Sequence, residues 1–185
     1  IACIPSEESF LIDGENKIFA VADGVTRDPY VHLPNTNTKI GKLHFAFGYP
    51  RPSPAKEAAD IFTKFSREFL LNFDKGNRNE EAIKEVFAQA NKEISRYRGR
   101  NIPCIDYVVN DYPGCVAALA SVQDSVVSYG YIVDAGVAFF DCFGSFISRT
   151  ADEGPSICHD TIWKDSALKN LTWRNPDARK FIRST

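Results

Sequence analysis

The sequence has no long hydrophobic run, no strong net charge and no methionine. No stretch approaches the roughly 20 apolar residues that a membrane helix needs, so we expect no membrane partner. The formal net charge of −2 gives no support to a general nucleic-acid or membrane-surface binder, and we expect no nucleic-acid partner. The start, Ile1 to Leu11, lacks a basic region followed by an apolar run and is not typical of a secretory signal. These absences favour a cytoplasmic protein, and a first residue other than methionine indicates a piece of a longer chain.

Paired-cysteine motifs are also absent. The cysteines are odd in number, widely scattered and form no CxxC pair, which favours reduced, mostly buried thiols. They are Cys3, Cys104, Cys115, Cys142 and Cys158.

The first half of the chain predicts a hairpin followed by two helices. β-Favouring runs at residues 9–12 and 17–22 flank a turn-rich link, which is typical of a β-hairpin. Apolar residues at helical spacing after Ser53 and again after Asn79 predict two amphipathic helices, and Gly99 is typical of the end of the second one. Ser53 suits the N-cap of the first helix, and Pro54 suits its first position.

The remaining segments predict a loop, a strand meander and a tail. Thr26 to Pro54 carries five prolines and is interpreted as a long irregular surface loop. A last helix is expected from about Pro176. Four strands joined by tight links are expected at residues 116–122, 125–133, 137–141 and 145–150. A hairpin, two helices and a meander form an α+β order in one domain, residues 1–185, with antiparallel pairing and helices over one side of the sheet.

Two acidic segments could do chemistry at one end of the predicted hairpin. An apolar strand runs directly into Asp23 and Gly24, which places a carboxylate on a rigid element and lets the backbone approach a ligand closely. This arrangement suits a hard cation such as magnesium, although Asp-Gly is equally a turn after a strand. Glu7 and Glu8 precede the other strand of the same hairpin. The three carboxylates would converge and repel one another unless cations compensate their charge. Without Asp23, Glu7 and Glu8 would be interpreted as part of a solvated acidic loop.

The order of the motifs resembles the metal-dependent, type 2C Ser/Thr protein phosphatases. FAVADG is the most specific match. GCVAALASV looks like the family's Gly-Ser/Thr-Thr-Ala strand with Cys115 and Val116 in place of hydroxyl residues, and YIVDAGVAFF resembles the family's Val-Gly-Asp-Ser-Arg link at Asp134. The resemblance covers residues 7–150, and it implies a four-layer αββα sandwich with two central antiparallel sheets, incomplete at the C-terminus.

The resemblance also implies a site and an activity. It implies two Mg²⁺ or Mn²⁺ ions, with Asp23 bridging them, Gly24 supplying a backbone carbonyl, and Glu7 and Glu8 acting through metal-bound waters. Asp111 would help to hold a third, weaker cation. The family usually has Glu-Asp where this chain has Glu7-Glu8, and its late metal aspartates and phosphate-gripping arginine have no match here.

The implied reaction is hydrolysis of phosphoserine or phosphothreonine in a protein substrate by a metal-bridging hydroxide. The sequence contains no Cys-x5-Arg loop, which argues against a cysteine-based phosphatase. Two alternatives stay open. One is a phosphatase-like binding or regulatory domain with weak or no catalysis, which the departures from the family pattern favour. The other is a hydrolase of small phosphorylated metabolites.

Overall fold

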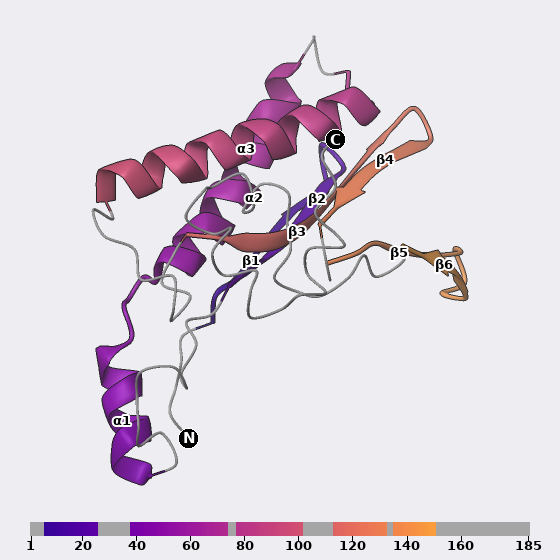
Figure 1. Ribbon diagram of the computed structural model, residues 1–185. Helices are drawn as coiled ribbons and strands as arrows, with labels where there is room; N and C mark the ends of the chain where they lie inside the picture. Colours follow the sequence, from indigo (N-terminus) through magenta and orange to yellow (C-terminus); the bar gives the residue numbers. More distant parts are fainter. Residues whose placement is uncertain (1–5, 26–37, 74–76, 102–112, 133–134, 151–185) are drawn as a thin grey trace, which may run out of the picture.

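The computed structural model describes residues 6–25, 38–73, 77–101, 113–132 and 135–150 (Figure 1). Its helices and strands follow the α+β order that the sequence predicts, and the class is confirmed. In chain order they are β1 (Glu8–Asp13), β2 (Ile18–Gly24), α1 (Lys39–Gly48), α2 (Pro54–Asn72), α3 (Glu80–Asn101), β3 (Cys115–Gln123), β4 (Val126–Tyr131), β5 (Ala138–Phe140) and β6 (Phe146–Arg149).

The main sheet has the strand order β1-β2-β3-β4, and each neighbouring pair is antiparallel. The predicted N-terminal hairpin is confirmed, and Lys17 closes its turn with a positive φ of 54°. The β3–β4 turn has two residues, Asp124 and Ser125, with φ of 48° and 66°. Positive φ at both central positions is the geometry that matches the right-handed twist of a two-stranded ribbon.

Asp13 links the first hairpin to α2. Its carboxylate accepts hydrogen bonds from the backbone N and from the side chain of Asn16, and from Nε of Arg67 on α2 at 2.7 Å. The hydrogen bonds from Asn16 are the largest cause of a lowered pKa of Asp13, and Arg67 adds to them against the opposing effect of burial. The ionised form of Asp13 therefore holds the turn against the helix.

Both long helices begin where side-chain caps are available. Ser53 Oγ accepts a hydrogen bond from the backbone N of Lys56 at 3.1 Å, and Pro54 occupies the first helical position, as the sequence predicts. Asn79 Oδ1 accepts from the backbone N of Ala82 at 3.0 Å at the start of α3. Helices α2 and α3 lie together on one face of the main sheet (Figure 1).

The core lies between this helical layer and the sheet. Small residues bring α2 close to β2, because Ala20, Ala22 and Ala58 are each at most 8% exposed. A Cβ on Gly24 would lie 2.7 Å from the backbone carbonyl carbon of Ala55, so only glycine fits there. The larger buried side chains of this core are Ile18, Phe62, Leu70, Ile83, Val86 and Leu119.

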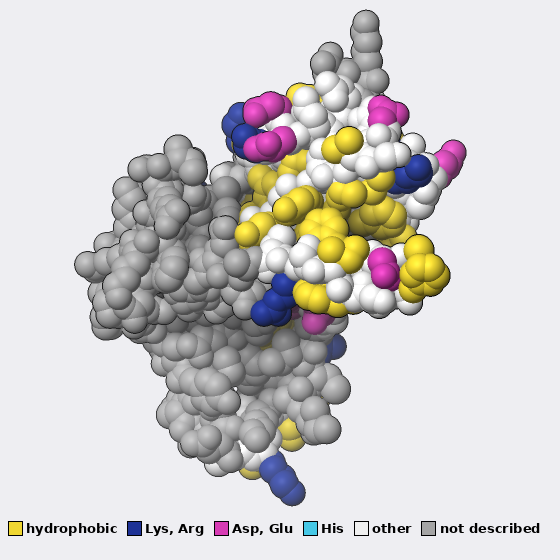
Figure 2. Space-filling view, turned by 90° about the vertical axis from the view of Figure 1, so that its right-hand side faces the viewer, with side chains coloured by type: hydrophobic (Ala, Val, Ile, Leu, Met, Phe, Trp, Pro, Cys, Tyr) yellow, Lys and Arg dark blue, Asp and Glu magenta, His cyan; other side chains and the backbone are white. Residues whose placement is uncertain are grey.

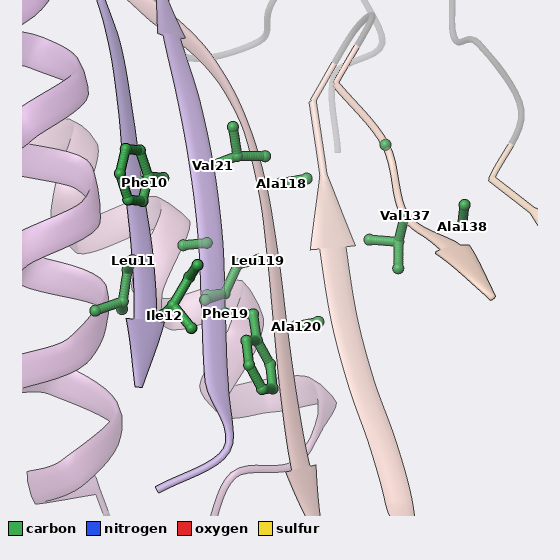
Figure 3. A pocket seen from close by; sticks show the side chains of 12 residues that line it. Phe10, Leu11, Ile12, Phe19, Val21, Ala118, Leu119, Ala120, Val137 and Ala138 are labelled. Carbon is green, nitrogen blue, oxygen red and sulfur yellow. The ribbon is translucent and has the colours of Figure 1, made fainter. Parts of the chain in front are cut away.

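The opposite face of the sheet is apolar and open in the described structure. Phe10 and Ile12 are 75% and 74% exposed, and they help to line an apolar hollow of about 360 Å³ whose far side is the 136–138 segment (Figures 2 and 3). Strands β5 and β6 form a separate two-stranded antiparallel sheet beside this face. The rings of Tyr129 on β4 and Phe139 on β5 have centroids 5.3 Å apart. A second helical layer beyond β5 and β6 is not found among the described residues.

Two predicted boundaries are wrong. Helix α1 lies inside the segment interpreted as an irregular loop, because the prolines flank it and Thr38 caps it, accepting from the backbone N of Gly41 at 3.0 Å. Helix α3 continues past Gly99, where the sequence predicts its end. Arg98 and Arg100 in the last turn complement the negative end of the helix dipole, which offsets the cost of glycine. The tail helix expected from Pro176 lies outside the described residues. None of the helices in the described ranges combines the length and apolar character that crossing a bilayer requires.

Candidate metal centre

Glu8 and Asp23 lie directly opposite each other in the β1–β2 ladder. Both are exposed, and both belong to the open face of the sheet, since side chains alternate along a strand and Phe10 and Val21 are exposed two residues away. Opposed residues of an antiparallel pair have Cβ atoms about 4.5–5.5 Å apart, at which distance two like charges repel. The register therefore creates a paired carboxylate position that a cation would stabilise.

The end of β2 is fixed on both sides. The backbone N of Gly24 donates to the carbonyl of Glu7 at 3.3 Å, and the backbone N of Val25 donates to the carbonyl of Gly114 at 2.9 Å. Asp23 is thus carried by a strand whose next two residues are tied to the segments preceding β1 and β3. A ligand held on such a strand keeps its position without support from a loop.

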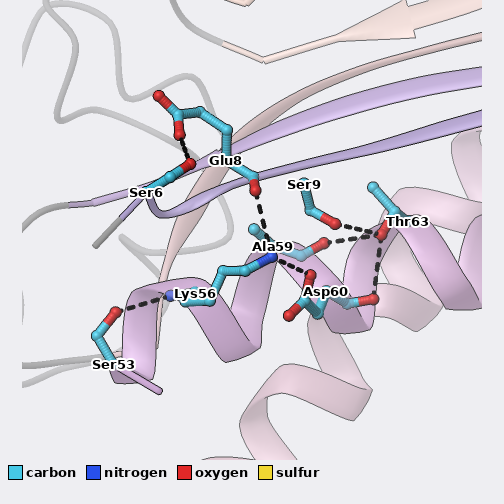
Figure 4. A network of polar contacts seen from close by, with 8 residues as sticks. All are labelled: Ser6, Glu8, Ser9, Ser53, Lys56, Ala59, Asp60 and Thr63. Atoms are coloured by element: carbon cyan, nitrogen blue, oxygen red, sulfur yellow. Dashed lines mark hydrogen bonds and ion pairs between the residues drawn. The ribbon is translucent and has the colours of Figure 1, made fainter. Parts of the chain in front are cut away.

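Glu8 is held in its ionised form and tied to α2 (Figure 4). The hydroxyl of Ser6 donates to the Glu8 carboxylate, and this bond is the largest cause of a lowered pKa of Glu8, to which the positive charge of Lys56 adds. Lys56 Nζ also donates to the Glu8 carbonyl at 3.2 Å and pairs with Asp60 at 2.5 Å. The contact between β1 and α2 therefore places the positive charge of Lys56 next to the backbone of Glu8.

Glu7 points away from this position, to the helical side of the sheet. It is 4% exposed, and its Oε1 accepts hydrogen bonds from the hydroxyl of Tyr49 at 2.7 Å and from the hydroxyl of Ser53. Its Oε2 is buried and has no hydrogen-bond partner in the described part of the protein. Glu7 therefore joins β1 to the residue after α1 and to the N-cap of α2.

Cys115 faces the core behind Asp23. Burial, with the negative charge of Asp23 as the second cause, raises the pKa of the Cys115 thiol to about 12. A thiol in this state is protonated at neutral pH and is a poor nucleophile. The substitution of Cys115 for a hydroxyl residue of the family pattern therefore adds no reactive group.

The donor set can be compared with what Mg²⁺ uses. Magnesium is commonly bound through one or two carboxylates, with waters and substrate phosphates completing its shell. Glu8 and Asp23 supply two carboxylates on adjacent strands, and they fit this requirement. No group of three or more His, Cys, Asp or Glu side chains in the described ranges is arranged to hold a metal ion. Asp111 and Asp134 lie outside those ranges.

Sequence reasoning brought Glu8, Asp23 and Gly24 to one end of the hairpin but missed the partners of Glu7. Tyr49 lies 42 residues from Glu7 along the chain, in the segment interpreted as a loop. Ser53 was identified only as a cap. The signal that could have separated Glu7 from Glu8 was the alternation of faces along an extended chain, which sends adjacent acids to opposite sides.

The comparisons with known proteins bear on the α+β fold alone. No family model matches the chain, and no curated protein matches it. A solved structure described as PppA, a key regulatory component of T6SS in Pseudomonas aeruginosa, is similar with a TM-score of 0.52 at 13% identity. The match covers 97% of this chain and 59% of that chain. It is consistent with a fragment of a type 2C-like fold.

Proposed function

We propose that this chain is part of a metal-dependent protein phosphatase that hydrolyses phosphoserine and phosphothreonine in protein substrates in the cytoplasm. The observation that supports the proposal best is the register of β1 and β2, which sets Glu8 opposite Asp23 at a rigid end of the sheet. The likeness to PppA supports the fold and does not bear on catalysis.

Two Mg²⁺ or Mn²⁺ ions, when bound, would supply an activated water and neutralise charge on the phosphoryl oxygens. Asp23 would be the shared ligand because its strand end is fixed on both sides, and Gly24 would offer its backbone carbonyl to a cation. The packing of α2 already requires glycine at this position. Ser6 and Lys56 would keep Glu8 ionised and oriented toward the same position. Asp111 is proposed for a third, weaker cation.

Among the described residues, the thiol behind Asp23 is not available as a nucleophile. The Cys115 thiol, with its pKa raised to about 12, stays protonated in the core, so attack on phosphorus falls to water. The Ser or Thr oxygen of the substrate is the leaving group. The role of the chain's own residues is to hold cations and orient them.

A second candidate function is a phosphatase-like binding or regulatory domain without catalysis. The placement of Glu7 favours it, because one of the acids expected at the metal centre is occupied by Tyr49 and Ser53 on the other face. Glu8 and Asp23 alone would then hold a cation without completing the two-metal centre that the hydrolysis uses.

The test is manganese-dependent release of phosphate from a phosphothreonine peptide by the full-length protein and by its Asp23→Asn variant. Asp124→Asn is the matched control, because Asp124 is exposed in a turn at φ 48°, where asparagine is tolerated. We expect Asp23→Asn to lose activity by at least about a hundredfold and to bind Mn²⁺ more weakly in calorimetry, with Asp124→Asn unchanged. A folded wild-type protein that releases no phosphate would favour the binding or regulatory domain.

A further inference from the structure

Helix α1 carries an apolar stripe that no other described element covers. Ile40, Leu43 and Phe47 are 69%, 51% and 85% exposed. Their spacing of three and four residues places them on one side of the helix. In Figure 1, α1 stands apart from the main sheet and from α2 and α3. The stripe therefore lies on a helix that stands apart from the other described elements.

The charge around α1 is of one sign. The sequence has no Asp or Glu between Asp28 and Glu57, whereas it has Lys39, Lys42 and other cations in that interval, in a chain whose net charge is −2. Lys39 and Lys42 belong to the first turns of α1, where the helix dipole is already positive. Cations there weaken the helix, so helix stability does not explain them.

The C-terminal end of α1 is fixed to the sheet. Tyr49, the residue after α1, is 4% exposed and donates its hydroxyl hydrogen bond to Glu7 at 2.7 Å. Ser53, at the start of α2, bonds to the same carboxylate. The end of α1 is therefore firmly attached to the sheet, while its apolar stripe is left uncovered by the described elements.

We propose that α1 binds an anionic lipid surface. Ile40, Leu43 and Phe47 enter the boundary between headgroups and acyl chains, and the lysines of α1 supply the attraction to anionic headgroups. The helix presents a convex stripe, which a soft planar surface covers without a matching groove. A protein partner would need an apolar groove with acidic rims of matching length.

This inference revises the expectation of no membrane partner, which rested on the lack of a membrane-spanning apolar stretch and on the charge of the whole chain. The formal net charge of −2 is the sum of a cationic interval around α1 and an excess of acidic residues elsewhere in the chain. A ten-residue helix provides only weak, reversible attachment at the surface. The inference does not depend on phosphatase activity.

The test is co-sedimentation of the full-length protein with vesicles of phosphatidylcholine containing about 30% phosphatidylserine, beside vesicles of phosphatidylcholine alone. We expect binding to the anionic vesicles that weakens with added salt. Removing both cations, with Lys39→Gln and Lys42→Gln, should lower the partition coefficient by about 25-fold, at about fivefold for each lysine. Leu43→Ser with Phe47→Ser should lower it by about a hundredfold.

Matched controls test whether vesicle binding depends on α1 or on any exposed aromatic or cationic side chain. Phe143→Ser removes an aromatic ring that is 90% exposed on the β5–β6 turn, and Lys92→Gln removes an exposed cation of α3. Both should bind anionic vesicles as the wild type does, and circular dichroism should show all variants folded.

Three outcomes overturn the proposal. One is a wild-type protein that does not co-sediment with anionic vesicles even at low salt. Another is co-sedimentation that the α1 substitutions leave unchanged. The third is a wild type that ignores vesicles and forms a concentration-dependent dimer that Leu43→Ser with Phe47→Ser abolishes. That result, seen by light scattering, would assign the stripe to a second copy of the chain.

Discussion

Replacing Tyr49 by phenylalanine should destabilise the protein by about 2 kcal/mol. The Tyr49 hydroxyl is buried and donates to Glu7 Oε1 at 2.7 Å, and removing one partner of a buried hydrogen bond costs about 1–3 kcal/mol. The substitution keeps the ring and its packing, so no cavity term is added. Glu7 would keep only Ser53 as a side-chain donor, while its Oε2 already has no partner in the described structure.

Urea unfolding followed by circular dichroism measures the effect, and a double-mutant cycle isolates the contact. Tyr49→Phe should cost much less in a Glu7→Leu background, which removes the acceptor, with a coupling energy of about 1 kcal/mol or more. Tyr129→Phe is the control, because Tyr129 is 42% exposed and its hydroxyl should matter by less than about 0.5 kcal/mol. Equal effects of the two Tyr→Phe changes, or strict additivity with Glu7→Leu, would refute the reasoning.

Two further predictions concern Asp13 and the cysteines. Since the pKa of Asp13 is lowered in the folded state, its stabilising contribution is present above the unfolded pKa of about 4 and is lost as pH falls through the lower folded value. Asp13→Asn should therefore be less stable than wild type in urea at about pH 6, and the gap should narrow toward about pH 2; a constant gap would contradict this. For the cysteines, a maleimide at about pH 8 should label exposed Cys142 in the native protein and spare Cys115, whose pKa is raised to about 12. Peptide mapping by mass spectrometry checks this, and equal labelling of the two would show that Cys115 is accessible.

The parts of the fold that local patterns determine were predictable. The first hairpin follows from two β-favouring runs around a turn, and α2 follows from a cap, a proline and an apolar stripe. The β3–β4 turn is short and polar, and its two residues take the positive φ that such a hairpin needs. In each case the sequence signal lies within a few residues of the structure it predicts.

The errors arise where contacts are distant or signals conflict. Helix α1 was hidden because its apolar stripe is unburied and prolines surround it, so the composition resembled a loop. The predicted end of α3 was wrong because the helix continues through Gly99. Arg98 and Arg100 in the last turn stabilise the helix by more than the glycine destabilises it. The bond from Tyr49 to Glu7 crosses 42 residues of sequence, and no local pattern encodes it.

The adjacent acids Glu7 and Glu8 should separate into two roles. Side chains of neighbouring residues in an extended chain point to opposite faces, and here one acid is buried under α2 while the other lies opposite Asp23. Glu7→Gln should therefore lower the urea midpoint and leave Mn²⁺ affinity near the wild-type value. Glu8→Gln should leave the midpoint unchanged, because Lys56 bonds to its carbonyl, and should weaken Mn²⁺ binding in calorimetry. Loss of Mn²⁺ binding in Glu7→Gln, with the midpoint intact, would place both acids at the cation and reverse the assignment of faces.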